Sequence, residues 1–246
     1  MPLPNLLIIG AQKSGTTWLH RSLAKSPQIF GSQVKELSFF TSARYRQEPE
    51  KYALNFPETR GARYYMESTP HYFRLPKGQV DVPARIKAFL PETPQMILML
   101  RQPADRYESA YIHHVMKGRQ PFVETITEMK EDFAMLKLGF YARILKHWQQ
   151  YFTDYHIHLY DELKADKHKL VDDIMGELGL VNDIRPADLE FRTNAKTIKM
   201  RKQGMDKLPV MDPDLRARLT AHYRDDILEL QDMIGRDLSH WLADPA

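Results

Sequence analysis

A loop of small residues around one lysine is the part of the sequence most suited to chemistry. It follows the apolar run at residues 6–9 and has the sequence Gly10-Ala11-Gln12-Lys13-Ser14-Gly15-Thr16-Thr17. Between a buried strand and a helix, successive backbone N–H groups of such a loop bind a phosphate, and the helix N-terminus favours its charge. A lysine within the loop reaches the same phosphate. The alternative is a tight turn whose glycines serve only the path of the chain.

The loop is close to the Walker A pattern of nucleotide triphosphatases but differs in its chemistry. That pattern places lysine directly after the second glycine, where this sequence has Thr16, and the lysine is instead Lys13. The apolar run at residues 96–100 ends at Arg101, with no aspartate to hold Mg²⁺. A P-loop kinase is therefore the less favoured enzyme, and a nucleotide-binding module without catalysis is the alternative from another class.

A second polar element begins where the apolar run at residues 95–100 ends. Arg101 occupies the position at which the carboxyl edge of a parallel sheet presents ligand-binding groups. Pro103 is suited to the first turn of a helix, on which Arg106 and Ser109 share one face. The alternative is an exposed basic helix start with Ser109 facing solvent.

The elements that must position these groups alternate between strand and helix. Continuous apolar runs predict buried strands at residues 6–9 and 95–100, and weaker patterns predict strands at 63–66 and 156–160. Helical periodicity follows at residues 17–24, 103–116, 140–152 and 166–178, and a long terminal helix begins at Asp212-Pro213. This alternation predicts a three-layer α/β fold with a central parallel sheet, in a single domain over residues 1–246.

Composition narrows the classes of protein to which the chain can belong. It has 246 residues, a formal net charge of +3 and no cysteine, so disulfides and thiol chemistry are excluded. The small net charge does not indicate nucleic-acid binding, and no apolar run is long enough to cross a bilayer. We expect a cytoplasmic protein; the sequence does not indicate an oligomeric state.

The two polar elements together resemble the PAPS-dependent sulfotransferases, where PAPS is 3′-phosphoadenosine 5′-phosphosulfate. The likeness lies in the lysine-containing loop at residues 13–18 and in the pattern R-x-P-x-x-R-x-x-S-x-Y at residues 101–111. It implies a P-loop-like fold, PAPS as donor, adenosine 3′,5′-bisphosphate (PAP) as product and no metal. The donor contacts that it implies in the loop fall on Lys13, Ser14, Gly15, Thr16, Thr17 and Trp18.

The resemblance also implies roles for particular residues along the chain. Lys13 would stabilise the leaving oxygen, and Arg101 and Ser109 would contact the 3′-phosphate. Tyr160, in Leu159-Tyr160-Asp161-Glu162-Leu163, would lie near the adenine, although a core tyrosine at a strand end explains it nearly as well. The basic segment with Lys199, Arg201, Lys202 and Gly204 resembles the late loop that closes over the 3′-phosphate; a solvated basic loop is the alternative.

Two residues are candidates for the general base that the acceptor needs. Glu36, in Lys35-Glu36-Leu37-Ser38-Phe39-Phe40, is similar to the catalytic glutamate of the carbohydrate-acting branch. His71 lies in Thr69-Pro70-His71-Tyr72-Phe73, where the phenol and steroid branch uses a histidine. Glu36 is favoured, which implies a carbohydrate or small-molecule acceptor with a hydroxyl or amine. Lys35 would either hold the donor sulfate or lower the pKa of the glutamate.

Overall fold

The structure is a computed structural model that describes residues 1–43, 45–191 and 207–243. The chain forms two compact units, one of residues 1–100 and 146–191 and the other of residues 101–145 and 192–246. The expected single domain over residues 1–246 stays a prediction.

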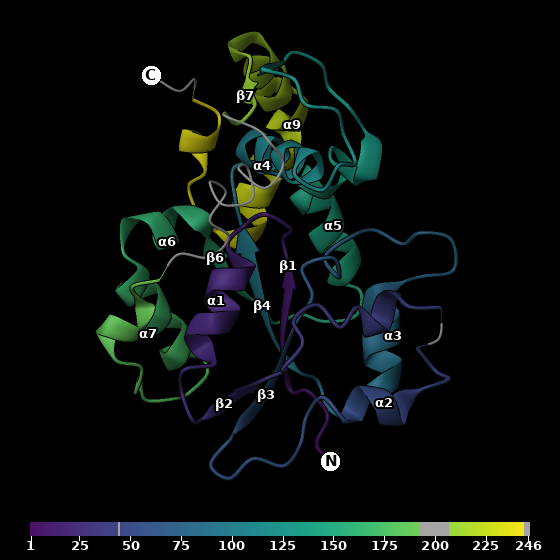
Figure 1. The fold of residues 1–246 in the computed structure, drawn as a ribbon, viewed down its shortest axis with the longest axis vertical. Helices are drawn as coiled ribbons and strands as arrows, with labels where there is room; N and C mark the ends of the chain where they lie inside the picture. The colour runs from purple at the N-terminus through teal and green to yellow at the C-terminus, as the bar shows by residue number, and fades with distance from the viewer. Residues whose placement is uncertain (44, 192–206, 244–246) are drawn as a thin grey trace. The chain divides into compact units, whose positions relative to one another are not determined.

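The described elements alternate between strand and helix, as Figure 1 shows. The strands are β1 (Leu6–Gly10), β2 (Ile29–Gly31), β3 (Tyr64–Ser68), β4 (Gln95–Leu100), β5 (Thr125–Ile126), β6 (His156–Leu159) and β7 (Val210–Met211). The helices are α1 (Thr16–Leu23), α2 (Pro49–Ala53), α3 (Val82–Phe89), α4 (Pro103–Val115), α5 (Tyr141–Trp148), α6 (Tyr160–Ala165), α7 (Lys167–Glu177) and α9 (Pro213–Ile234). Short 3₁₀ turns lie at Phe39–Thr41, Asp132–Ala134, Lys137–Gly139, Pro186–Leu189 and Ser239–Trp241.

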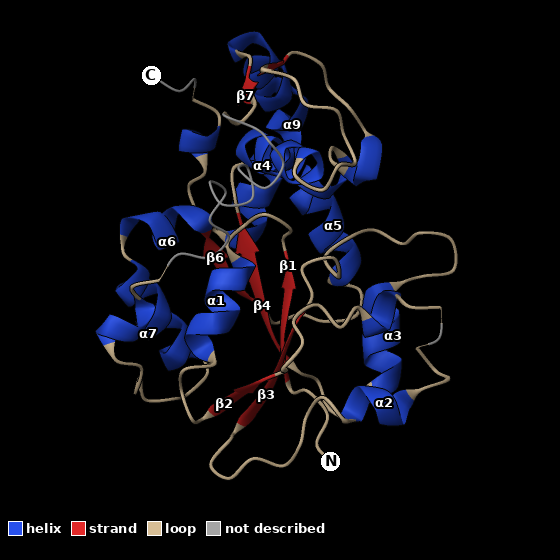
Figure 2. Cartoon of the chain, in the orientation of Figure 1, coloured by secondary structure: helices blue, strands red, loops and turns tan. Residues whose placement is uncertain are grey.

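The first unit is built on one parallel sheet of five strands, drawn red in Figure 2, in the order β2-β3-β1-β4-β6. β1 pairs with β3 through Leu6 and Met66 and with β4 through Ile8 and Ile97. All five residues of β1 are buried because the strand lies at the centre of the sheet. All its strands run the same way, so the loops after β1, β3, β4 and β6 leave the same edge.

Helices cover both faces of this sheet. α1 and α7 pack against the face that carries Leu6, Ile8 and Met99. The apolar side chains of both helices and of this face form one core cluster. Because side chains alternate along a strand, Leu7 and Ile9 point to the other face. α2 and α3 lie on that side in Figure 1, with α1, α6 and α7 on the opposite side. The predicted three-layer α/β fold with a central parallel sheet is confirmed.

The second unit is mainly helical. α4 packs against α9, and β5 pairs with β7 in a short parallel ladder. The carboxylate of Asp226 on α9 accepts hydrogen bonds from the N–H groups of Ala142 and Arg143, at 3.0 and 3.1 Å, at the start of α5. These bonds satisfy helix donors that have no partner within the helix.

Among the described residues no helix has the length and apolar character needed to span a membrane. The expectation of a cytoplasmic location stays a prediction.

Candidate active site

The predicted phosphate loop lies at the carboxyl end of β1, the central strand of the sheet. Gly10 ends the strand, and the N–H of Ala11 donates to Met99 O on β4 at 2.6 Å. A Cβ atom at Gly10 would come within 2.5 Å of Phe73 Cβ, so only glycine fits there. The start of the loop is thus held by β4 on one side and by the segment after β3 on the other.

The backbone of the loop turns sharply to begin α1. Lys13 has a φ of 72° and Gly15 a φ of 86°, both in the left-handed region. The N–H groups of Trp18 and Leu19 donate to Gly15 O at 2.9 and 3.1 Å, and no side chain of the described residues caps the helix. The first N–H groups of a helix have no partner within it, and they carry the positive end of its dipole. This helix start is suited to an anion.

Ser14 supplies a second indication of a ligand at the loop. Its side chain is fully buried, and its Oγ has no hydrogen-bond partner among the described residues. A buried hydroxyl without a partner costs free energy, about 1–3 kcal/mol. A phosphate or sulfate oxygen at this loop would accept its hydrogen bond, so the loop fits an anionic group of a nucleotide.

The other predicted loop residues divide between the site and the core. Thr16 is buried and Thr17 half-buried in the first turn of α1. The Trp18 ring belongs to the core cluster, where it stacks on Phe191 with ring centroids 6.0 Å apart. Donor contact at Trp18 stays a prediction; its indole packs in the core.

Tyr160 lies against the phosphate loop. It is the first residue of α6, directly after β6, and so belongs to the same edge of the sheet. A Cβ atom at Gly15 would come within 3.1 Å of the Tyr160 ring and 2.8 Å of Leu163. The sequence-predicted pairing of Tyr160 with the nucleotide site is therefore compatible with its position, and its contact with adenine stays a prediction.

Glu36 lies in the segment that follows β2 and is tied to the end of β3. Its N–H donates to Ser68 O at 3.0 Å, and its side chain is 55% exposed. Lys35 Nζ donates to Glu36 Oε1 at 2.7 Å. Burial lowers the pKa of Lys35, whose hydrogen bond to Glu36 acts in the opposite direction. The glutamate is thus accessible and has a cation at its side.

His71 lies beside the phosphate loop. Its Nδ1 is 3.4 Å from Nε2 of Gln12, which is a loop residue. The segment of His71 is held to β1, because the N–H of Thr69 donates to Ile8 O and that of Phe73 to Ile9 O. Both candidate bases therefore belong to the unit that carries Lys13, and both are attached to the strand ends around the loop.

Arg101 and Ser109 belong to the second unit. Arg101 directly follows β4, and its guanidinium Nη2 lies 3.6 Å from Asp105 Oδ2. Tyr141 donates to Arg101 O at 2.9 Å, and Ser109 is buried on α4. Their 3′-phosphate role stays a prediction, as does that of Lys199, Arg201, Lys202 and Gly204, which lie outside the described residues.

Arg106 is fully buried on α4 and donates to Met135 O. The sequence spacing places it on one face with Ser109, and its burial and its hydrogen bond indicate a packing role in the helical unit.

The sequence did not reveal Glu67 as a functional candidate. This carboxylate is buried at the end of β3 and accepts hydrogen bonds from Tyr52, Tyr72 and Thr69. The signal available in the sequence is an acidic residue that directly follows the strand predicted at residues 63–66.

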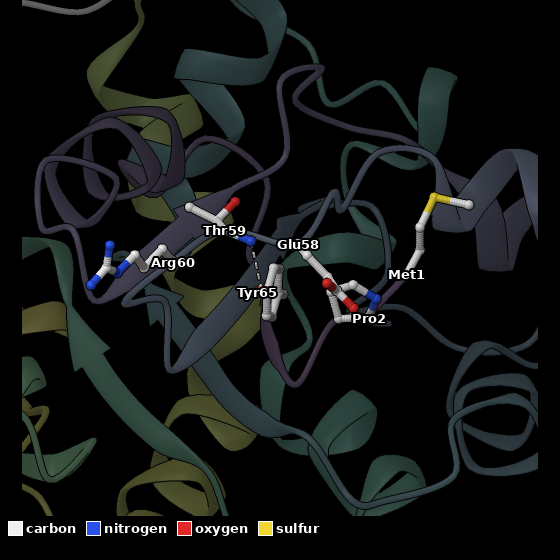
Figure 3. Close-up of a pocket in the computed structure, with 6 residues that line it drawn as sticks. All are labelled: Met1, Pro2, Glu58, Thr59, Arg60 and Tyr65. Carbon is white, nitrogen blue, oxygen red and sulfur yellow. Dashed lines mark hydrogen bonds between the residues drawn. The ribbon is translucent and has the colours of Figure 1, made fainter.

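An open cavity of about 770 Å³ lies elsewhere in the first unit. Figure 3 shows its lining, formed by Met1, Pro2, Glu58, Thr59, Arg60 and Tyr65. These residues precede β1 and β3 or begin β3, so they lie at the amino edge of the sheet. The cavity is thus separate from the carboxyl edge that carries the phosphate loop.

Known proteins resemble the chain over nearly its whole length. The model of the sulfotransferase domain family matches residues 3–225. A crystal structure of a sulfotransferase from Alicyclobacillus acidocaldarius aligns with 99% of this chain and 100% of its own, at a TM-score of 0.78 and 26% identity. The sulfotransferase domain from the curacin biosynthetic pathway, 14% identical at a TM-score of 0.55 and covering 77% of each chain, shares the fold.

Curated relatives are larger proteins. The human bifunctional heparan sulfate N-deacetylase/N-sulfotransferase 1 is 28% identical over 98% of this chain and 31% of its own length. The corresponding bovine enzyme 2 is also 28% identical with the same coverage. The chain thus spans about a third of the length of these relatives. The loop, its helix and the family match over residues 3–225 lead to one conclusion: the chain belongs to the sulfotransferase family.

Proposed function

We propose that the chain transfers a sulfuryl group from PAPS to a hydroxyl or amine of a sugar or small-molecule acceptor, by in-line displacement and without a metal. The observation that carries this proposal is the loop at residues 10–17, with its buried Ser14 hydroxyl and uncapped helix start, in a chain of the sulfotransferase family. PAPS supplies the activated sulfuryl group; the protein supplies position and charge.

Lys13 and the loop N–H groups have the central role in this proposal. Sulfuryl transfer, like phosphoryl transfer, develops negative charge on the leaving oxygen, and a nearby cation with fixed N–H donors stabilises that charge. Lys13 would neutralise the bridging oxygen, and the start of α1 with Ser14 would bind the 5′-phosphate. Arg101 and Ser109 would bind the 3′-phosphate and so select the donor from other adenine nucleotides.

Glu36 is the proposed general base. It would remove the proton of the acceptor as the new bond to sulfur forms, a contribution worth about 10²- to 10⁴-fold in rate. Its exposed carboxylate and its neighbour Lys35 support this assignment. His71 is the alternative base because it lies beside loop residue Gln12.

A carbohydrate acceptor is the favoured class. The relatives named as heparan sulfate N-sulfotransferases, and the resemblance of the Glu36 segment to the carbohydrate-acting branch, support this proposal. An amine on a glucosamine unit and a ring hydroxyl are both acceptors of the required chemistry.

A paired-acceptor assay tests the function. The protein is incubated with PAPS and with matched oligosaccharides that carry a free amine, an N-acetyl group or an N-sulfate at the same position. We expect PAP release that depends on an acceptor, and preference within the set identifies amine or hydroxyl transfer. PAP release at the same rate with and without every sugar would argue against a sugar acceptor.

A further inference from the structure

A buried carboxylate, that of Glu67, lies next to the segments that carry the two candidate bases. Glu67 lies in β3 next to its last residue, Ser68, whose carbonyl accepts a hydrogen bond from the Glu36 N–H. Glu67 is 1% exposed, and its carboxylate accepts hydrogen bonds from three hydroxyl groups. Tyr72 donates to Glu67 Oε1 at 2.6 Å, Thr69 donates to the same oxygen at 2.8 Å, and Tyr52 donates to Oε2.

Two of these hydroxyls connect Glu67 to the segment of Glu36. The N–H of Ser38 donates to Thr69 Oγ1 at 3.2 Å, and the N–H of Phe40 donates to the Tyr72 hydroxyl at 3.3 Å. Each hydroxyl thus donates to the carboxylate and accepts from the backbone. A hydroxyl has one proton to donate and two lone pairs that accept. Because Glu67 accepts the hydrogen bond that each hydroxyl donates, the hydroxyl lone pairs point toward the N–H groups of Ser38 and Phe40.

The Glu36 segment needs such attachment because its backbone is strained. Glu36 has a φ of 66° and Ser38 a φ of 54°, and neither is glycine. Left-handed conformations of this kind cost about 1–3 kcal/mol each and persist only where the surroundings hold them. The restraints on this stretch include the bond from the Glu36 N–H to Ser68 O and the two bonds to the hydroxyls of Thr69 and Tyr72. Arg85 Nη1 also donates to Phe40 O at 3.1 Å.

The rings of Tyr52 and Tyr72 also restrain the segment of Glu36. Phe39 stacks on Tyr52 with centroids 3.9 Å apart and planes 12° apart, and Phe40 contacts Tyr72 edge to face. Burial raises the pKa of Glu67, while the hydrogen bonds from Tyr52, Tyr72 and Thr69 act to lower it. The three O–H donors occupy three of the roughly four lone-pair sites of the carboxylate.

We propose that Glu67 is a positioning residue: through the hydroxyls of Thr69 and Tyr72, it holds the strained segment 36–40 in the conformation that presents Glu36 at the site. The functional half of this inference rests on the proposed function of Glu36. The structural half, that Glu67 fixes the amides of Ser38 and Phe40 through two separate hydroxyls, does not.

Residue-resolved hydrogen exchange of the whole chain tests the structural half without turnover. Thr69→Val should raise the exchange rate of the Ser38 amide at least 10-fold and leave the Phe40 amide within about 3-fold, and Tyr72→Phe should do the reverse. Glu67→Leu should raise both, because it removes the one oxygen, Oε1, to which both hydroxyls donate. Tyr52→Phe is the matched control, since it removes a hydroxyl on Glu67 but keeps the ring on Phe39, and both amides should stay protected.

Turnover with an accepted sugar tests the functional half. Glu67→Leu should lower kcat at least 10-fold, keep PAP affinity within about 3-fold and retain the acidic limb of the pH profile, because the base is misplaced and still present. Glu36→Gln should remove that limb. If no acceptor supports turnover, the proposed function fails while the exchange pattern still decides the role of Glu67. A uniform rise in exchange that includes the β1 amides, or no change at Ser38 and Phe40 in any variant, would overturn the proposal.

Discussion

Individual side chains of the loop and of the segments beside it determine what chemistry the proposed site performs. Lys13 contributes a charge within a loop that leads into the uncapped start of α1, and Ser14 contributes a buried hydroxyl without a partner among the described residues. Glu36 and His71 lie in different segments of the same unit. The residue proposed to act on the donor, Lys13, and those proposed to act on the acceptor, Glu36 or His71, are different, so substitution can separate their effects.

Lys13→Ala should lower kcat much more than it lowers donor affinity. A group that acts mainly on charge developing at the leaving oxygen stabilises the transition state more than the bound ground state. We expect at least a 100-fold loss in kcat with a change in PAP affinity below about 10-fold, measured by steady-state kinetics and calorimetry. Normal turnover of this variant would contradict the assignment of Lys13.

Glu36→Gln and His71→Gln separate the two candidate bases. If Glu36 accepts the proton, Glu36→Gln keeps shape and hydrogen bonding but lowers kcat roughly 100-fold or more, with PAP affinity unchanged. His71→Gln should then affect mainly the KM of the acceptor. Steady-state kinetics over a pH series measures both effects, and the opposite pattern transfers the role to His71 and weakens the case for a sugar acceptor.

At the scale of secondary-structure elements, most of the framework of the site could be predicted from the sequence. β1 and β4 are continuous apolar runs because they lie at the centre of the sheet, and the helices after them begin where the glycine loop and Pro103 indicate. β2 has three residues, too few for periodicity to identify. The sequence does not predict α3, although Pro83 lies in its first turn and Ile86 is buried, because only Val82, Pro83 and Ile86 of its eight residues are buried and the apolar pattern is weak.

The contacts around Glu67 could not be predicted, because they join residues from different segments. Tyr52 is on α2, and Ser38 and Phe40 follow β2, so only the packing of the sheet brings them to β3. The phosphate loop was predictable because its residues are consecutive. Chemistry built from one local segment is visible in a sequence, whereas a cluster assembled by tertiary packing is visible only in a structure.

α1 also carries a buried histidine, His20, that should make the free energy of unfolding depend on pH. Burial, with a further contribution from Lys35, lowers the pKa of His20 to about 4 from the ordinary 6.5. Between these values the unfolded chain binds a proton that the folded chain does not, so the free energy of unfolding should decrease as the pH falls from about 6.5 to 4. The decrease from this group is about 3 kcal/mol in full.

His20→Gln measures that contribution by urea unfolding at pH 7.5 and 4.5. The substitution should reduce the loss of stability between the two pH values, since glutamine does not titrate. His240→Gln is the matched control, because His240 is exposed. An identical pH dependence in the wild type and in His20→Gln would contradict the effect of burial on His20.

At the scale of the whole molecule, each of the two compact units carries part of the proposed donor chemistry. The first has the phosphate loop, Tyr160 and both candidate bases, and the second has Arg101 and Ser109. Both units are included in the family match over residues 3–225. The donor specificity should therefore depend on residues of both units.

Nucleotide binding tests this dependence on the intact chain. PAP at 100 times its Kd should raise the free energy of unfolding by about 2.7 kcal/mol, and 5′-AMP at the same concentration should raise it much less, because it lacks the 3′-phosphate. Arg101→Ala should remove most of the difference, a loss of about 2–5 kcal/mol in binding free energy for one charged contact. Equal affinities of PAP and 5′-AMP for the wild type in calorimetry would refute the 3′-phosphate assignment.

Mass spectrometry of an acceptor panel measures directly whether the chain moves a sulfuryl group from PAPS to an acceptor. The wild type is incubated with PAPS, EDTA and a panel of sugars, phenols and amines, with Lys13→Ala in parallel. We predict that at least one acceptor gains about 80 Da, the mass of SO₃, in equal amount to the PAP released, and that Lys13→Ala yields far less of this product. No mass gain on any acceptor while PAP binds normally, or a gain that requires Mg²⁺, would contradict the account.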